Sequence, residues 1–175
     1  MHRVTIRATS PDLAGRLGCL GPVKDALRDV AEGWGISGDG LGDVMTVAYE
    51  LVVNALRYSP PGLLQAALLL SPDGDRVVVE VYDLTTRMPR VPDGAFGDDE
   101  AECGRGLLMV GALSAQCGAN VTAGGKRVWA ELVLPAPVSV PKLSRAVRRD
   151  VVLAEALRTS HLRAVPRRPR VGAPR

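Results

Sequence analysis

Glu50 and Asn54 are the two side chains best suited to chemistry, and they stand four residues apart in a largely apolar segment, AYELVVNA at 48–55. On a helix this spacing places both side chains on one face, one turn apart. A carboxylate there can act as a general base, and an amide oxygen can bind Mg²⁺, which takes hard oxygen ligands. The alternative is a polar helix face exposed to water. Arg57 and Tyr58 follow one turn further on.

Asp83 is the next candidate, at the end of the valine-rich segment RVVVEVYD at 76–83. The alternation of this segment predicts a strand, with Val77, Val79 and Val81 on one face. A carboxylate at the strand end, beside the irregular stretch 84–103, can accept a hydrogen bond from a ligand amino group. It can equally cap the turn that follows the strand. Long irregular stretches in compact domains are usually lids or disordered segments.

Two glycine-containing segments could approach a ligand closely. Gly104-Arg105-Gly106 precedes Leu107 and an apolar run, so we expect the glycines at a helix start, where backbone N–H groups and the helix dipole attract phosphate. Arg105 would add a charge-assisted hydrogen bond. The segment lacks the spacing of a Walker motif and also fits a simple hinge. Gly124-Gly125-Lys126-Arg127 is typical of a hairpin turn.

The elements that would position these residues follow from apolar periodicity and from breaker residues. Proline and glycine at 59–62 end the helix that carries Glu50. Helices between runs of hairpin-connected strands predict an α+β two-layer sandwich, with helices on one face of a mixed, largely antiparallel sheet. The expected helices are 22–34, 41–58 and 107–116, and the expected strands are 4–8, 63–70, 76–83, 119–122 and 127–134.

Composition narrows the class of protein. The chain has 175 residues, of which 46% are hydrophobic, enough for one compact domain with a core. Three cysteines without CxxC spacing and two histidines at opposite ends argue against a zinc site or a disulfide framework. No run approaches the roughly 18 apolar residues of a membrane span. The N-terminus lacks the apolar core of a secretory signal, which predicts a cytoplasmic protein.

The C-terminal part is basic. From Lys142 onward, ten lysines and arginines stand against two acidic residues, whereas the net charge of the whole chain is only +3. We expect one folded domain to occupy 1–137, an amphipathic helix to lie within 138–165, and a disordered basic tail to span 166–175. Basic tails can contact nucleic acid, but no aromatic residue interleaves with these arginines, so nucleic acid is not the expected partner.

The order of the motifs resembles the GHKL ATPase superfamily, whose ATP-binding domain has the Bergerat fold. Within it, the sequence is most similar to actinobacterial ATP-binding regulators related to anti-sigma-factor serine/threonine kinases. The resemblance spans about residues 5–135. It is carried by ELVVNALRYS at 50–59, VYDLTTRMPRVP at 81–92, GRGLLMVGALSAQCG at 104–118 and GGKRVWAELVLP at 124–135.

The resemblance implies a role for each matching residue, with ATP and Mg²⁺ as cofactors. Glu50 would be the general base, Asn54 would coordinate Mg²⁺, and Asp83 would hydrogen-bond the adenine amino group. The glycine segment would close on the phosphates. The residues implied at or near the nucleotide are Asn54, Asp83, Gly104, Arg105, Gly106 and Leu107, with Arg57, Tyr58 and Lys126 as neighbours of phosphate or base.

Three positions depart from the pattern of the family. Tyr58 stands where a histidine is usual, and Leu84-Thr85-Thr86 replaces a glycine-containing turn. Arg127 occupies the place expected for a threonine that supports the adenine site.

The resemblance implies a serine/threonine kinase that phosphorylates a STAS-type anti-sigma-factor antagonist, and that also binds a sigma factor, with a homodimer as a plausible state. Phosphoryl transfer requires little covalent chemistry from the protein. A metal ion, a general base and hydrogen-bond donors that face the phosphates are sufficient. The departures favour the alternative of a nucleotide-dependent binding module without useful catalysis. A third hypothesis places the function in the basic tail.

Overall fold

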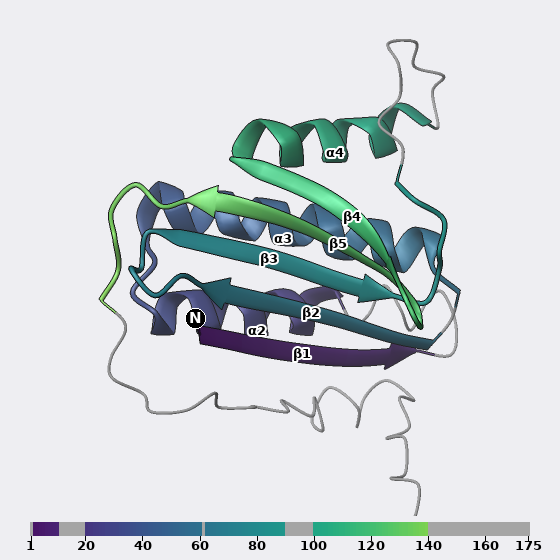
Figure 1. The fold of residues 1–175 in the computed structure, drawn as a ribbon, viewed down its shortest axis with the longest axis horizontal. Helices are drawn as coiled ribbons and strands as arrows, with labels where there is room; N and C mark the ends of the chain where they lie inside the picture. Colours follow the sequence, from purple (N-terminus) through teal and green to yellow (C-terminus); the bar gives the residue numbers. More distant parts are fainter. Residues whose placement is uncertain (1, 11–19, 61, 90–99, 140–175) are drawn as a thin grey trace, which may run out of the picture.

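The computed structural model describes residues 2–10, 20–60, 62–89 and 100–139. Five strands form one sheet in the order β1-β2-β3-β5-β4, and every neighbouring pair is antiparallel. Helices α2 and α3 cover one face of this sheet, and α4 packs against α3 near β4 and β5 (Figure 1). The elements are β1 (His2–Ser10), α2 (Leu20–Gly33), α3 (Gly38–Tyr58), β2 (Gly62–Leu70), β3 (Arg76–Asp83), α4 (Glu100–Leu113), β4 (Gln116–Thr122) and β5 (Gly125–Val133).

The core lies between the sheet and helices α2 and α3. Helix α2 buries Val23, Leu27 and Ala31 at helical spacing, as its periodicity predicts. Helix α3 is apolar on more than one side because it packs on α2, on the sheet and on α4. Its buried residues are Gly40, Val44, Met45, Val47, Ala48, Leu51, Val52, Ala55 and Leu56.

Strand β3 runs through the middle of the sheet and confirms the alternation predicted for 76–83. Val77, Val79 and Val81 are fully buried and belong to the core beneath the helices. Because side chains alternate along a strand, Asp83 extends the same row toward the helical layer. Glu80 lies on the opposite face of the sheet.

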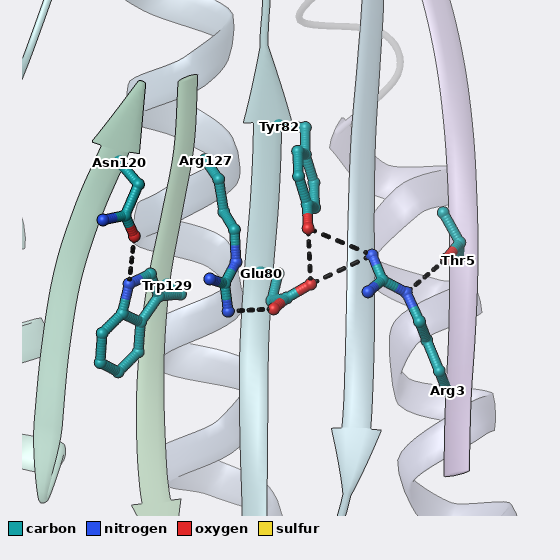
Figure 2. A network of polar contacts seen from close by, with 7 residues as sticks. All are labelled: Arg3, Thr5, Glu80, Tyr82, Asn120, Arg127 and Trp129. Carbon is teal, nitrogen blue, oxygen red and sulfur yellow. Dashed lines mark hydrogen bonds and ion pairs between the residues drawn. The ribbon is translucent and has the colours of Figure 1, made fainter. Parts of the chain in front are cut away.

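That opposite face carries a polar network centred on Glu80 (Figure 2). The Glu80 carboxylate forms ion pairs with Arg3 on β1, at 3.1 Å, and with Arg127 on β5. The Tyr82 hydroxyl donates a hydrogen bond to the same carboxylate at 3.0 Å. The Arg127 guanidinium also lies over the Trp129 ring, 5.6 Å from its centre. The network therefore joins β1, β3 and β5 through side chains.

A second cross-strand pair on this face joins Arg76 to Glu131. Arg76 Nη1 donates a hydrogen bond to Glu131 Oε1 at 2.6 Å. This hydrogen bond and the carboxylate charge raise the pKa of Arg76.

The α+β sandwich is confirmed, with two differences from the expected elements. Among the described strands no pair is parallel, so the sheet is not mixed. Helix α4 begins at Glu100 and ends at Leu113, where the sequence predicted a helix over 107–116. The predicted C-terminal helix and basic tail lie outside the described residues, except that 138–139 are irregular. None of the described helices is long and apolar enough to cross a bilayer.

Candidate functional site

Glu50 and Asn54 lie on α3 as predicted, one turn apart and both half-buried. The Asn54 side-chain Nδ2 is buried and has no hydrogen-bond partner. A flip of the side-chain amide would place the oxygen Oδ1 at this buried position. Buried polar atoms normally have partners, which marks Asn54 as a residue that a ligand can satisfy.

Gly106 of α4 lies directly against the Glu50 carboxylate. A Cβ atom added at Gly106 would overlap Glu50 Oε2 and stand 3.1 Å from Glu50 Cδ. The absence of a side chain at 106 is therefore what lets α4 approach the carboxylate. The structure thus brings together two of the predicted motifs, the Glu50 helix and the glycine segment, which are 56 positions apart in the chain.

The prediction that the glycine segment precedes a helix was wrong. Gly104, Arg105 and Gly106 lie inside α4, because the helix begins four residues before Gly104, at Glu100. Glycine costs a helix only about 1 kcal/mol relative to alanine, so two glycines weaken α4 without ending it. Arg105 is exposed and Leu107 is half-buried. The glycine segment therefore lies within the helix and not at its N-terminus, where free N–H groups could bind phosphate.

Asp83, at the end of β3, forms a buried ion pair with Lys126. Lys126 Nζ lies 2.7 Å from Asp83 Oδ2, and the two side chains are 6% and 1% exposed. Their Cα atoms are direct partners in the β3–β5 register. Although this contact is not an aligned hydrogen bond, the 2.7 Å distance makes the Lys126 ammonium the charge partner of Oδ2.

Local hydrogen bonds fix the end of β3 against the end of α3. The Thr85 N–H donates to Asp83 Oδ1 at 3.0 Å, which closes the turn that the sequence allowed. The Leu84 N–H donates to Ser59 Oγ at 3.0 Å, and Ser59 is the C-cap of α3. The helix that carries Asn54 therefore ends beside the strand that carries Asp83, although no hydrogen bond or ion pair joins Asp83 directly to Glu50 or Asn54.

Gly125 supports the same corner from the hairpin that joins β4 to β5. Its φ of +146° is a conformation that side-chain-bearing residues rarely adopt. A Cβ atom there would lie 2.8 Å from both the Asp83 carbonyl carbon and Leu84 Cα. The sequence predicted a turn here but not its contact with Asp83. The only sequence signal for that contact is the double glycine of the turn.

The remaining residues singled out in the sequence lie at different places. Arg57 and Tyr58 lie at the C-terminal end of α3 and are exposed. Lys126, expected as a neighbour of phosphate or base, is the side chain that meets Asp83. Arg127, at the position where the family pattern expects a threonine of the adenine site, lies on the outer face with Glu80, because consecutive residues of a strand point to opposite faces.

The donor set can be tested against the implied Mg²⁺. No group of three or more metal-ligating side chains of the His, Cys, Asp and Glu types occurs in the described part of the chain. Mg²⁺ sites built on nucleotides need few protein ligands, because phosphates and water supply the rest. The amide of Asn54 beside the carboxylate of Glu50 fits a Mg²⁺ site that is completed by a nucleotide. These two side chains are too few for a Mg²⁺ site built from protein ligands alone.

A comparison with family models decides the assignment. The model of the histidine kinase-like ATPase domain matches residues 13–132, more than half of the chain. The chain belongs to this family. The match runs from before α2 into β5 and includes every predicted site residue, while β1 and the C-terminal part lie outside it.

A histidine kinase-like ATPase domain belongs to the GHKL superfamily, so the expected family is confirmed, and membership implies ATP binding. The closer resemblance to anti-sigma-factor kinases stays a prediction. A search of curated proteins finds no match for the chain.

Proposed function

We propose that this histidine kinase-like ATPase domain is an ATP- and Mg²⁺-dependent protein serine/threonine kinase of the anti-sigma-factor type. Its substrate would be a STAS-type antagonist protein, and a sigma factor would be a second partner. The observation that carries the proposal is the position of Glu50, half-buried on α3 against Gly106 and one turn from the unsatisfied amide of Asn54. The partners come from the sequence resemblance.

Glu50 would take the proton of the attacking hydroxyl. In the transfer, the serine or threonine oxygen of the partner forms a bond to the γ-phosphorus, the bond to the ADP oxygen breaks, and the hydroxyl proton passes to the Glu50 carboxylate. The close approach of Gly106 limits the positions that the carboxylate can adopt. A positioned base lowers the entropic cost of reaching the transition state.

Asn54 would hold Mg²⁺ through its amide oxygen, and Asp83 would accept a hydrogen bond from the base of the nucleotide. When bound, the metal would neutralise charge on the phosphates. Arg105, exposed on α4, can reach anionic groups that approach this side of the domain.

A second candidate function is a nucleotide-dependent binding module without useful catalysis. Two observations favour it. Asp83 is already paired with Lys126, and the glycine segment lies within α4 rather than at a helix N-terminus. On this hypothesis ATP would reorganise α4 and so change a protein-binding surface, with no transfer to the partner.

Titration calorimetry with Mg-ATP on the wild type, Asp83→Asn and Asn54→Ala tests the nucleotide site. Either substitution should weaken binding by at least about tenfold, the effect of one lost charge-assisted or metal contact. Glu50→Ala should retain binding, because Glu50 is assigned to the transfer and not to the nucleotide. Wild type and Asn54→Ala binding Mg-ATP equally would contradict the metal assignment.

A phosphotransfer assay against candidate STAS-type proteins separates the two functions. Wild type should transfer phosphate and Glu50→Ala should lose at least about 100-fold in rate, the usual effect of a general base. Equal transfer by Glu50→Ala would remove the base assignment. ATP binding without transfer to any candidate would favour the binding module. Deleting 142–175 should leave ATP binding intact in both cases, and its loss would support a function of the basic tail.

A further inference from the structure

The outer face of the sheet, which is the face that carries Glu80, presents positive charge. By the alternation of side chains along the strands, the charged residues that point to this side are Arg3, Arg7, Arg76, Arg127, Glu80 and Glu131. The arginine side chains at 3, 76 and 127 are 42%, 47% and 31% exposed, whereas the carboxylates that pair with them are 3% and 25% exposed. Because the guanidinium groups reach water more than their carboxylate partners do, the surface of this face is cationic.

This charge limits what can cover the outer face. A second copy that docked by the same face would set arginines against arginines. The segment from Lys142 onward carries ten lysines and arginines against two acidic residues. Like charges across an interface oppose association, and in the described part of the chain no helix packs on this side of the sheet (Figure 1). The outer face therefore fits an anionic partner.

Trp129 gives the outer face a flat aromatic surface. It is the register partner of Gly118 on β4, and a Cβ atom added at Gly118 would lie 3.1 Å from Trp129 Cζ2 and 3.2 Å from Cε2 and Nε1. The indole therefore lies over the glycine backbone, with one ring face on the sheet and the other turned outward (Figure 2). The indole N–H donates a hydrogen bond to Asn120 Oδ1 at 3.1 Å, which fixes the ring. A fixed indole with an outward face is a surface on which a nucleobase can stack.

Two of the arginines lie at the ends of one row across the sheet. The row consists of successive register partners on β5, β3, β2 and β1, namely Arg127, Tyr82, Gln65 and Arg7. Strands are about 4.8 Å apart, so the row spans about 14 Å, which corresponds to about four phosphates of a stacked single strand. The Arg127 guanidinium also lies 5.6 Å from the centre of the Trp129 ring. A base stacked on this indole would have its phosphate close to a positive charge.

We propose that the outer face of the sheet binds single-stranded nucleic acid, with a base stacked on Trp129 and phosphates in contact with Arg127 and Arg7. An acidic peptide would also satisfy the arginines, but its carboxylates offer no planar ring to the indole. Unlike the basic C-terminal part, this face combines arginines with aromatic rings. The site is separate from Glu50 and Asn54, which lie in the helical layer on the other side of the sheet.

Fluorescence anisotropy of a labelled single-stranded oligothymidylate of about ten nucleotides tests the affinity of the full chain. Trp129→Leu should weaken binding by about tenfold, the usual effect of removing one stacking ring. Tyr49→Leu is the matched control, because Tyr49 is also an exposed aromatic residue beside a cation, with Lys24 Nζ 5.9 Å from its ring centre, but lies on α3. Its affinity for the oligothymidylate should equal that of the wild type.

Intrinsic tryptophan fluorescence tests contact with the indole directly. The chain has two tryptophans, and Trp34 is only 8% exposed and belongs to the core. Unlabelled oligothymidylate should therefore quench the wild type and leave Trp129→Phe unquenched, since only Trp34 emits in that variant. Trp129→Phe keeps an aromatic ring and should lose less affinity than Trp129→Leu.

The salt dependence of binding tests the arginines. Arg7→Met should reduce the slope of log affinity against log salt concentration by about 0.7, the value for one lost phosphate contact on a single strand. Arg28→Met removes the same charge from α2 in the helical layer and should leave the slope unchanged. An equal change in both variants would show that the net charge of the chain, and not the outer face, sets the affinity.

Three results would overturn the proposal. Equal affinity of the wild type and Trp129→Leu, without quenching, would assign the oligothymidylate to the basic C-terminal part. Tighter binding of an oligoglutamate of the same charge would make the outer face a site for acidic peptides. Absence of oligothymidylate binding to the wild type at low salt would remove the site itself. Circular dichroism establishes that each variant is folded, and should neither Trp129 variant fold, quenching of the wild type supports the proposal and its absence overturns it.

Discussion

Strand β3 carries two buried carboxylates, Glu80 and Asp83, that differ in face and in the completeness of their contacts. Both side chains are at most 3% exposed. Glu80 faces away from the helices and has three polar partners, the arginines at 3 and 127 and the Tyr82 hydroxyl. Asp83 faces the helical layer at the strand end, and its oxygen Oδ2 has an ion pair but no aligned hydrogen bond.

The comparison shows that burial of a charge does not by itself mark a functional site. Glu80 is satisfied by groups from β1, β3 and β5, so its network is structural, and Figure 2 shows it spread across the open face of the sheet. Asp83 lies beside the C-cap of α3, and its Oδ2 is held by Lys126 without an aligned hydrogen bond. A buried polar group whose hydrogen bonding is incomplete is costly unless a ligand completes it.

The largest effect should come from Gly125→Ala, which acts on the backbone beneath Asp83. The added Cβ would meet the Asp83 carbonyl and Leu84 Cα, in a backbone conformation that alanine rarely adopts. The free energy of unfolding should fall by about 3–5 kcal/mol, from overpacking and strain combined. Urea unfolding measures it. Gly124→Ala is the matched control, with open space around its Cβ, and an equal loss there would show that the turn rather than the Asp83 contact is responsible.

Lys126→Met should cause the second-largest loss of stability. It tests how strongly Asp83, unlike Glu80, depends on a single charge partner. Removing the lysine leaves Asp83 as an unpaired buried charge, which should lower the free energy of unfolding by about 3 kcal/mol. The double variant Asp83→Asn/Lys126→Met has no unpaired charge and should recover most of that loss. Thermal and urea unfolding of the single and double variants measure the coupling. If the double variant were as unstable as Lys126→Met, the unpaired charge of Asp83 would not be the cause of the loss.

Glu80→Gln should have a smaller effect and no effect on the site. Its partners Arg3 and Arg127 are partly exposed, at 42% and 31%, so water can solvate them, and a loss of about 1–2 kcal/mol in unfolding free energy is expected. ADP affinity should stay unchanged by calorimetry. Glu131→Gln, which breaks the exposed pair with Arg76, is the control and should cost under about 1 kcal/mol. If Glu80→Gln reduced ADP affinity as Asp83→Asn is expected to, the separation of the two faces would fail.

Gly106→Ala should change stability least, since the atom that meets the new Cβ is the flexible end of Glu50. The expected change is within about 1 kcal/mol, because helix propensity offsets part of the crowding. The rate of phosphotransfer should nevertheless fall by at least about tenfold, as the base is displaced from its position. Gly111→Ala on the same helix, where a Cβ has open space, should be slightly stabilising and keep full transfer. Equal transfer by both variants would show that the position of Glu50 does not matter.

The periodicity of apolar residues predicted those helices and strands that bury one apolar face. In β3 the predicted face of valines is confirmed, because Val77, Val79 and Val81 pack into the core beneath the helices, although Glu80 on the other face is buried too. The start of α4 was missed because glycine was read as a helix boundary, and glycine only weakens a helix. The sequence named Glu50, Asn54 and Asp83 as candidates, whereas it did not indicate the contacts of Ser59 and Gly125 with the end of β3.

The order of residues along the chain alone determined the helices, most of the strands and the family, because apolar spacing and local motifs are properties of neighbouring residues. Pairing between distant segments was decided only by the tertiary structure. The β3–β5 register placed Lys126, and not Arg127, on Asp83, since a shift of one residue moves a side chain to the other face. The packing of α4 on α3 likewise brought Gly106 to Glu50, a contact that neither local motif specifies.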